Sequence, residues 1–173
     1  MSYRPVQRDI PVELLTEAGW IVGKLRIPAA RRLVDFLNQG KQMLNLTDVY
    51  VPERDVRLPF FAVRACACLA VLPETVEPAE AGPSDVIQTA EHRVVMMLGP
   101  SSVQGRIRVA AGLRLSDWFI RQHGFIAVQD AVFKLRTHLA QEGVVTEFHE
   151  MLVQADKVVG ITELDAPLFE TPE

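Results

Sequence analysis

Cysteine is scarce in this chain of 173 residues, where Cys66 and Cys68 are the only two. Two residues apart on one strand, their backbones would be about 6.5 to 7 Å apart, too far for an ordinary disulfide. A structural zinc site takes four ligands, commonly in C-x-x-C or H-x-x-x-H spacing, and neither spacing occurs. We therefore predict small, reduced cysteines on a buried strand, no metal site and a cytoplasmic location.

The chain also lacks long apolar runs and an excess of positive charge. Its longest uncharged apolar run is 65–72, whereas a membrane-spanning helix needs about 20 residues. No apolar stretch follows the first residues, so we expect no secretory signal. With 18 Lys and Arg against 22 Asp and Glu, the net charge of −4 argues against a nucleic-acid partner. We expect no membrane insertion.

Signatures of catalysis are missing as well. The sequence contains no Gly-rich phosphate loop, no G-x-S-x-G elbow and no H-E-x-x-H motif. Arg4 and Arg8 resemble the arginine pair of PilZ-type cyclic-dinucleotide receptors, but no D/N-x-S-x-x-G partner follows them. We predict a protein that is not an enzyme and that needs no cofactor.

What the chain does have is an internal repeat. Residues 21–51 align without a gap on residues 103–133, at a constant offset of 82. The seven identical pairs are Gly23/Gly105, Arg26/Arg108, Ala29/Ala111, Arg32/Arg114, Leu33/Leu115, Asp35/Asp117 and Asp48/Asp130. A fixed period of this kind indicates two copies of one structural unit.

Both copies predict the same elements. Alternating apolar residues indicate strands over 12–16, 20–27 and 43–51, with a hairpin turn at 17–19. Apolar residues at i, i+3 and i+4 predict a short helix over 32–38 and another over 114–120. A fourth strand over 60–72 corresponds to 151–164 at an offset of 90. The longer connection in the second copy, 134–149, is expected to be an extended hairpin, with a short helix as the alternative.

The predicted fold is therefore α+β and mainly β. It consists of two β-β-α-β-β repeats that pack as a pseudo-twofold dimer. The first repeat covers 1–72 and the second 92–173. Between them, 73–91 is an acidic, proline-containing linker whose composition does not favour a core.

Two sets of charged residues recur in the copies. An acid within an apolar row should be paired, protonated or placed at a bulge, so we predict a structural polar network rather than a catalytic site. Its members are Arg32, Asp35, Asp48, Arg114, Asp117 and Asp130. The outward basic pairs could instead form a candidate ligand-binding stripe, and they are Lys24, Arg26, Arg106 and Arg108.

These motifs resemble a small bacterial β-rich domain family of unknown function, with phrases similar to RLSDFLN and FIxLTDA. Residues 32–38 and 46–48 match in the first copy, and residues 114–119 and 125–130 match in the second. The second copy departs at Ile120, where the first has Asn38. The resemblance implies a bacterial source and a compact β fold such as a small Sm-like barrel, and it supplies no activity.

The function predicted from the sequence is a non-enzymatic, cytoplasmic adaptor or assembly module that binds a partner protein. Sheet edges and the charged segment 52–57 are the expected binding surfaces. The alternatives are a regulatory protein that binds RNA or a cyclic dinucleotide, and an enzyme built on Asp48 and Asp130. A homo-oligomer is a further candidate assembly.

Overall fold

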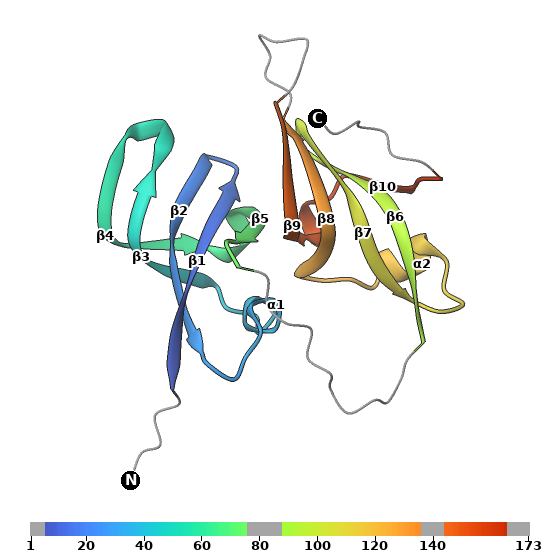
Figure 1. Cartoon of the computed structure of the whole chain (residues 1–173), viewed down its shortest axis with the longest axis horizontal. Coiled ribbons are helices and arrows are strands. Elements are labelled where there is room, and N and C mark those ends of the chain that lie inside the picture. Colours follow the sequence, from blue (N-terminus) through green and yellow to red (C-terminus); the bar gives the residue numbers. More distant parts are fainter. Residues whose placement is uncertain (1–5, 76–87, 136–143, 166–173) are drawn as a thin grey trace.

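The computed structural model describes residues 6–75, 88–135 and 144–165, and it is mainly β (Figure 1). Ten strands form one antiparallel sheet in the order β10-β6-β7-β8-β9-β5-β1-β2-β3-β4. We call β1–β5 the N-terminal half and β6–β10 the C-terminal half. None of the described helices is long and apolar enough to cross a membrane.

The two halves follow one succession of elements. The N-terminal half consists of β1 (Gln7–Thr16), β2 (Gly19–Pro28), α1 (Leu33–Leu37), β3 (Met43–Val51), the 3-10 helix η1 (Pro52–Arg54), β4 (Val56–Arg64), η2 (Ala65–Ala67) and β5 (Cys68–Pro73). The C-terminal half consists of β6 (Thr89–Leu98), β7 (Ser101–Ala110), α2 (Leu115–Phe119), β8 (Phe125–Leu135), β9 (Val144–Gln154), η3 (Ala155–Lys157) and β10 (Gly160–Glu163).

The predicted fourth strands, 60–72 and 151–164, are each interrupted by a 3-10 turn. In both turns the backbone amide of residue 68 or 158 donates to the carbonyl of the alanine three residues earlier. The turn allows the chain to pass from one edge of its half to the other. In the N-terminal half it leads from β4 to β5, which pairs with β1, and in the C-terminal half from β9 to β10, which pairs with β6.

The same turn separates the environments of the two cysteines, which were expected to share a buried strand. Cys66 lies in η2 and is exposed, whereas Cys68 begins β5 and is buried. Burial, with a smaller contribution from Cys66, raises the pKa of the Cys68 thiol to about 12. Cys68 is therefore a protonated core side chain at neutral pH.

Other boundaries differ from the prediction as well: β1 begins at Gln7 rather than at residue 12, and β4 begins at Val56 rather than at residue 60. β6 begins at Thr89, inside the predicted linker 73–91, and segment 76–87 of that linker lies outside the described residues. The expected hairpin at 134–149 is present, since β8 and β9 pair as far as Leu135 and Val144. Its tip, 136–143, also lies outside the described residues.

The hydrogen-bonded registers of the two halves agree at an offset of 82. Val12 lies opposite Gly23 in the β1–β2 hairpin, and Val94 lies opposite Gly105 in the β6–β7 hairpin. The agreement includes an irregularity. Between Val22–Tyr50 and Lys24–Thr47 the register of β2 and β3 shifts by one residue, and the same shift recurs between β7 and β8.

This shared bulge explains two of the identities in the repeat. Asp48 and Asp130 are the extra residues, and both have left-handed backbones, with φ of 52° and 45°. Aspartate tolerates this conformation better than most side chains do. Opposite each bulge lies a glycine, Gly23 or Gly105, where the neighbouring strand approaches closely.

The halves join through β5 and β9, and the expected pseudo-twofold arrangement is wrong. Ala70 lies opposite Val153 and Val71 lies opposite Leu152, in antiparallel pairing. A twofold axis would pair corresponding edges, such as β4 with β9 or β5 with β10. Because the last strand of one half pairs with the fourth strand of the other, the halves are arranged head to tail.

The junction also merges the two hydrophobic cores. Phe125 and Leu152 of the C-terminal half belong to the cluster around α1, which includes Leu25 and Leu46. In return, the cluster of the C-terminal half contains three residues of β1 and β5, namely Leu15, Ala70 and Leu72. Each half alone would therefore expose part of its core to water. This exposure would reduce the stability by about 25 cal/mol for each Å² of apolar surface.

The close approach at the bulge predicts that Gly105→Ala destabilises the protein more than Gly23→Ala. A Cβ atom at Gly105 would overlap the side chain of Val128 and lie 2.9 Å from the Gln129 carbonyl oxygen. At Gly23 the nearest atom, the Thr47 carbonyl oxygen, is 3.2 Å away. We expect Gly105→Ala to cost about 1–3 kcal/mol of unfolding free energy in denaturant titrations. Equal stability of the two variants would contradict the asymmetry.

Candidate functional site

Three of the four strand residues that were candidates for ligand binding are engaged with carboxylates, and they are Lys24, Arg26 and Arg106. Lys24 Nζ lies 2.8 Å from Asp48 Oδ2, and the Arg26 guanidinium donates to both carboxylate oxygens of Asp9 at 2.8 and 3.2 Å. The hydrogen bond to Asp48 raises the pKa of Lys24, and the hydrogen bond from Arg26 lowers the pKa of Asp9. These exposed pairs leave little net charge on that strand face.

The second set of basic residues is placed in the same way but far from the first. Arg106 forms an ion pair with the bulge residue Asp130 and another, at 2.8 Å, with Glu91. Arg108 lies opposite Glu91 in the β6–β7 register. Four strands lie between β2 and β7 in the sheet, so the four basic residues do not form one stripe.

The bulge aspartates have partners other than the expected helix residues. Asp48 and Asp130 bind the strand residues Lys24 and Arg106. Arg32 and Arg114 are the extended N-cap residues of α1 and α2, and Asp35 and Asp117 lie in the first helical turns. In the described part of the chain, no ion pair joins Arg32 to Asp35 or Arg114 to Asp117.

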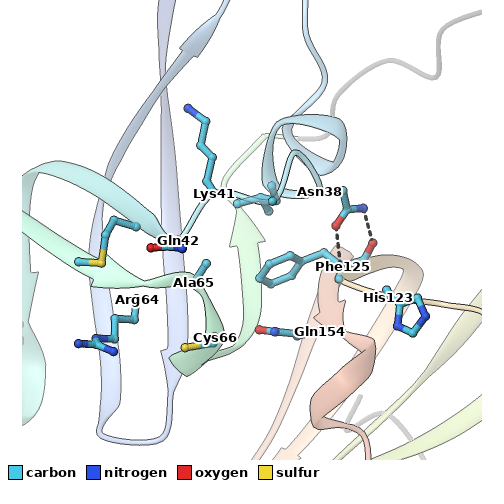
Figure 2. Close-up of a pocket in the computed structure, with 13 residues that line it drawn as sticks. Asn38, Lys41, Gln42, Arg64, Ala65, Cys66, His123, Phe125 and Gln154 are labelled. Carbon is cyan, nitrogen blue, oxygen red and sulfur yellow. Dashed lines mark hydrogen bonds between the residues drawn. The ribbon is translucent and has the colours of Figure 1, made fainter.

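A cleft of about 700 Å³ lies beside the junction of the halves (Figure 2). One wall comes from the end of α1, the segment leading into β3, the end of β4 and the turn η2. The other comes from the start of β8, the two residues before it and the end of β9. The lining side chains carry positive charge at Lys41 and Arg64 and a histidine at His123, and none of them is acidic.

Asn38 closes one end of this cleft. Its amide nitrogen donates to the Phe125 carbonyl oxygen at 2.8 Å, and its amide oxygen accepts from the Phe125 backbone nitrogen at 2.7 Å (Figure 2). The side chain thus satisfies the free backbone groups of Phe125 as a neighbouring strand would. No sequence motif predicts this contact, although Asn38 ends the repeated phrase 32–38 and is replaced by Ile120 in the second copy.

Further side chains connect the two halves. Lys157 Nζ lies 2.6 Å from Glu17 Oε1, and the hydrogen bond to Glu17 raises the pKa of Lys157. Trp20 meets the ring of Phe133 edge to face, with centroids 5.9 Å apart. Gln154 also reaches across the junction to η2. With the side-chain amide oriented so that its nitrogen faces this turn, Gln154 donates to the Ala65 carbonyl oxygen at 3.0 Å.

A second candidate surface is the edge strand β4. Phe60 and Phe61 are both exposed there, although aromatic side chains are usually buried. One acid of the charged segment 52–57 already has a partner within the chain. The carboxylate of Glu53 accepts a hydrogen bond from the backbone nitrogen of Trp20 at 2.8 Å. Among the strands that the structure describes, none pairs with the outer side of β4.

Neither surface has the composition of a metal centre. Among residues 6–75, 88–135 and 144–165, no three His, Cys, Asp or Glu side chains gather as a metal site would require. The comparisons add no relative: no family model, curated protein or solved structure matches the chain significantly. The functional argument therefore rests on the cleft and the edge strand.

The clamp between Asn38 and Phe125 predicts a measurable loss in Asn38→Ala. Two backbone groups of Phe125 would lose their partners in a partly buried site, which costs about 1–3 kcal/mol in unfolding free energy. Asn45→Ala, at an exposed position of β3, is the matched control and should change stability little. The Phe125 amide should also exchange with deuterium faster in Asn38→Ala, and unchanged exchange would refute the clamp.

Proposed function

We propose that this protein is a non-enzymatic adaptor or assembly module of the bacterial cytoplasm. It consists of two fused copies of one β-rich unit, each a small, curled, barrel-like sheet. The recurrence of one register and one bulge at an offset of 82 supports the duplication. The bacterial source rests on the motif resemblance, and the cytoplasmic location rests on that resemblance and on the two free cysteines.

The observation that carries the proposal is the open aromatic edge of the sheet. In the described part of the chain, the outer side of β4 has no partner strand, and its exposed Phe60 and Phe61 add apolar contact area. Such an edge binds an added strand through main-chain hydrogen bonds, while side-chain pockets provide specificity. Proteins otherwise protect long, apolar edges, because exposed edges promote aggregation.

A pull-down tests whether this edge binds protein. Phe60→Ser with Phe61→Ser should abolish capture of the proteins retained by the wild-type chain, because the variant lacks the apolar anchors. Val6→Ser, which removes an exposed apolar side chain at the start of the N-terminal half, should retain them. Equal capture by all three proteins would contradict an edge-binding module. So would a wild-type chain that captures neither another protein nor a second copy of itself.

The cleft favours a second candidate function, the binding of an anionic small molecule by a regulatory protein. Lys41 and Arg64 bring positive charge to a cavity of ordinary ligand size, and no lining side chain is acidic. A cyclic dinucleotide has two phosphates that could bind these groups. RNA is a weaker form of this alternative, because Lys24, Arg26 and Arg106 are already paired with acids.

Binding of a fluorescent cyclic dinucleotide tests this second function. We expect its affinity to fall with added salt and to drop about tenfold or more in Lys41→Ala with Arg64→Ala, since each charge-assisted contact contributes about 1.5–3 kcal/mol. Lys24→Ala is the matched control, because Lys24 lies on β2 in an ion pair with Asp48. Affinity that is absent, or indifferent to both salt and these substitutions, would exclude the cleft as the site.

A further inference from the structure

Within residues 6–75, 88–135 and 144–165, the sheet ends in two free edges, which correspond to the two edges already joined inside the chain. β4 is the last strand on one side and β10 is the last on the other, at opposite ends of the molecule (Figure 1). At the internal junction, β9 of the C-terminal half pairs with β5 of the N-terminal half. β4 and β10 occupy the matching places in their own halves.

The match holds residue by residue at an offset of 90. Val63 lies opposite Leu44 in the β3–β4 pair, as Val153 lies opposite Ile126 in the β8–β9 pair. On the other edge, Ala70 lies opposite Leu15, as Gly160 lies opposite Met97. Applying the internal register to the free edges therefore places Gly160 opposite Val63 and Ile161 opposite Ala62.

Apolar side chains that are exposed in one chain lie along these edges. Phe61 of β4 is 37% exposed, whereas Met151, its counterpart on the joined strand β9, is fully buried. On the β10 side, Val159 and Met97 are exposed next to the first residue of the strand. The positions that the internal junction buries are therefore apolar at the free edges as well, but there they are exposed.

A second point of contact is also apolar on both free sides. Asn38 at the end of α1 binds Phe125 at the start of β8 across the internal junction. The residues at the corresponding free positions are Ile120, which is 76% exposed, and Met43, which is 42% exposed. A polar clamp inside the chain is therefore matched by a complementary apolar pair at the free edges.

We propose that the partner of this module is a second copy of the same chain, bound head to tail. β10 of one chain adds to β4 of the next in the register of the internal junction, and Ile120 packs on Met43 of that next chain. This inference rests on the proposed assembly function. Contacts between unlike edges produce a closed ring if the rotation between copies closes, and an open fibre otherwise.

The junction between chains is weaker than the junction inside one. The internal contacts Lys157–Glu17 and Trp20–Phe133 have no equivalents at the free edges, where Ala67 and Gly99 replace the first pair and Val51 and Ser102 replace the second. Chain connectivity also favours the internal junction entropically. The assembly should therefore dissociate on dilution.

Engineered cysteines test the register. In a Cys66→Ser background, Ala62→Cys with Ile161→Cys should form a ladder of disulfide-linked chains under mild oxidation, because directly opposed side chains lie within disulfide reach. Ala62→Cys with Glu163→Cys is the control, shifted by two residues along β10, and should cross-link much less. Equal cross-linking in both variants, or in neither, would overturn the proposed register.

Sedimentation of the intact chain tests the assembly itself. We expect a concentration-dependent oligomer whose association weakens about tenfold or more in Ile120→Asp, as for loss of a single anchor worth more than about 1.4 kcal/mol. Val6→Asp, a control of similar exposure just before β1, should associate like the wild type. Far-ultraviolet circular dichroism confirms that both variants are folded.

The outcomes separate the two proposals. A wild-type chain that remains monomeric at all concentrations overturns self-assembly. If such a monomer still captures another protein through Phe60 and Phe61, the adaptor function stands with a different partner. If it captures nothing, both proposals fail.

Discussion

Backbone pairing between β5 and β9 is the interaction on which the rest of the structure depends. It joins ten strands into one sheet, and it brings α1 close enough for Asn38 to bind Phe125. It also exchanges apolar side chains between the two cores. A β-rich half of this size buries a modest fraction of its surface alone, so a shared core is a physical reason for keeping two halves in one chain.

The head-to-tail geometry of that junction has a consequence that a twofold arrangement would not have. A twofold contact uses the same edge of each half and is complete with two copies. Here one edge of each half takes part in the junction and the other does not, so the sheet ends in β4 and β10. The exposed aromatic residues of β4 and the exposed Ile120 are at these remaining surfaces.

The sequence predicted local structure well where side-chain pattern determines it. The repeat predicted β3 at 43–51, as observed, and both helices to within one residue at each end. These elements are predictable because the spacing of their apolar residues follows directly from the sequence. The interpretation of Asp48 included a bulge among its alternatives, and the left-handed backbone at Asp48 and Asp130 agrees with it.

Pairing between distant edges could not be predicted in the same way. Strand pairing uses main-chain groups that every residue carries, so a repeat does not reveal which edges meet. The break at η2, which separates Cys66 from Cys68, is another such case, because the alternation of small and apolar residues continues through it. The partners of Asp48 and Asp130 also depended on the neighbouring strands, where Lys24 and Arg106 were already outward-facing.

Native-state hydrogen exchange of the amides that point across the β5–β9 junction tests the central claim most directly. If the halves form one cooperative sheet, amides of Val71, Leu152 and their neighbours that bond across the junction should exchange only through global unfolding, with the protection of the most stable core amides. Exchange of these amides through a separate opening of much lower free energy, with each half still folded, would contradict the account.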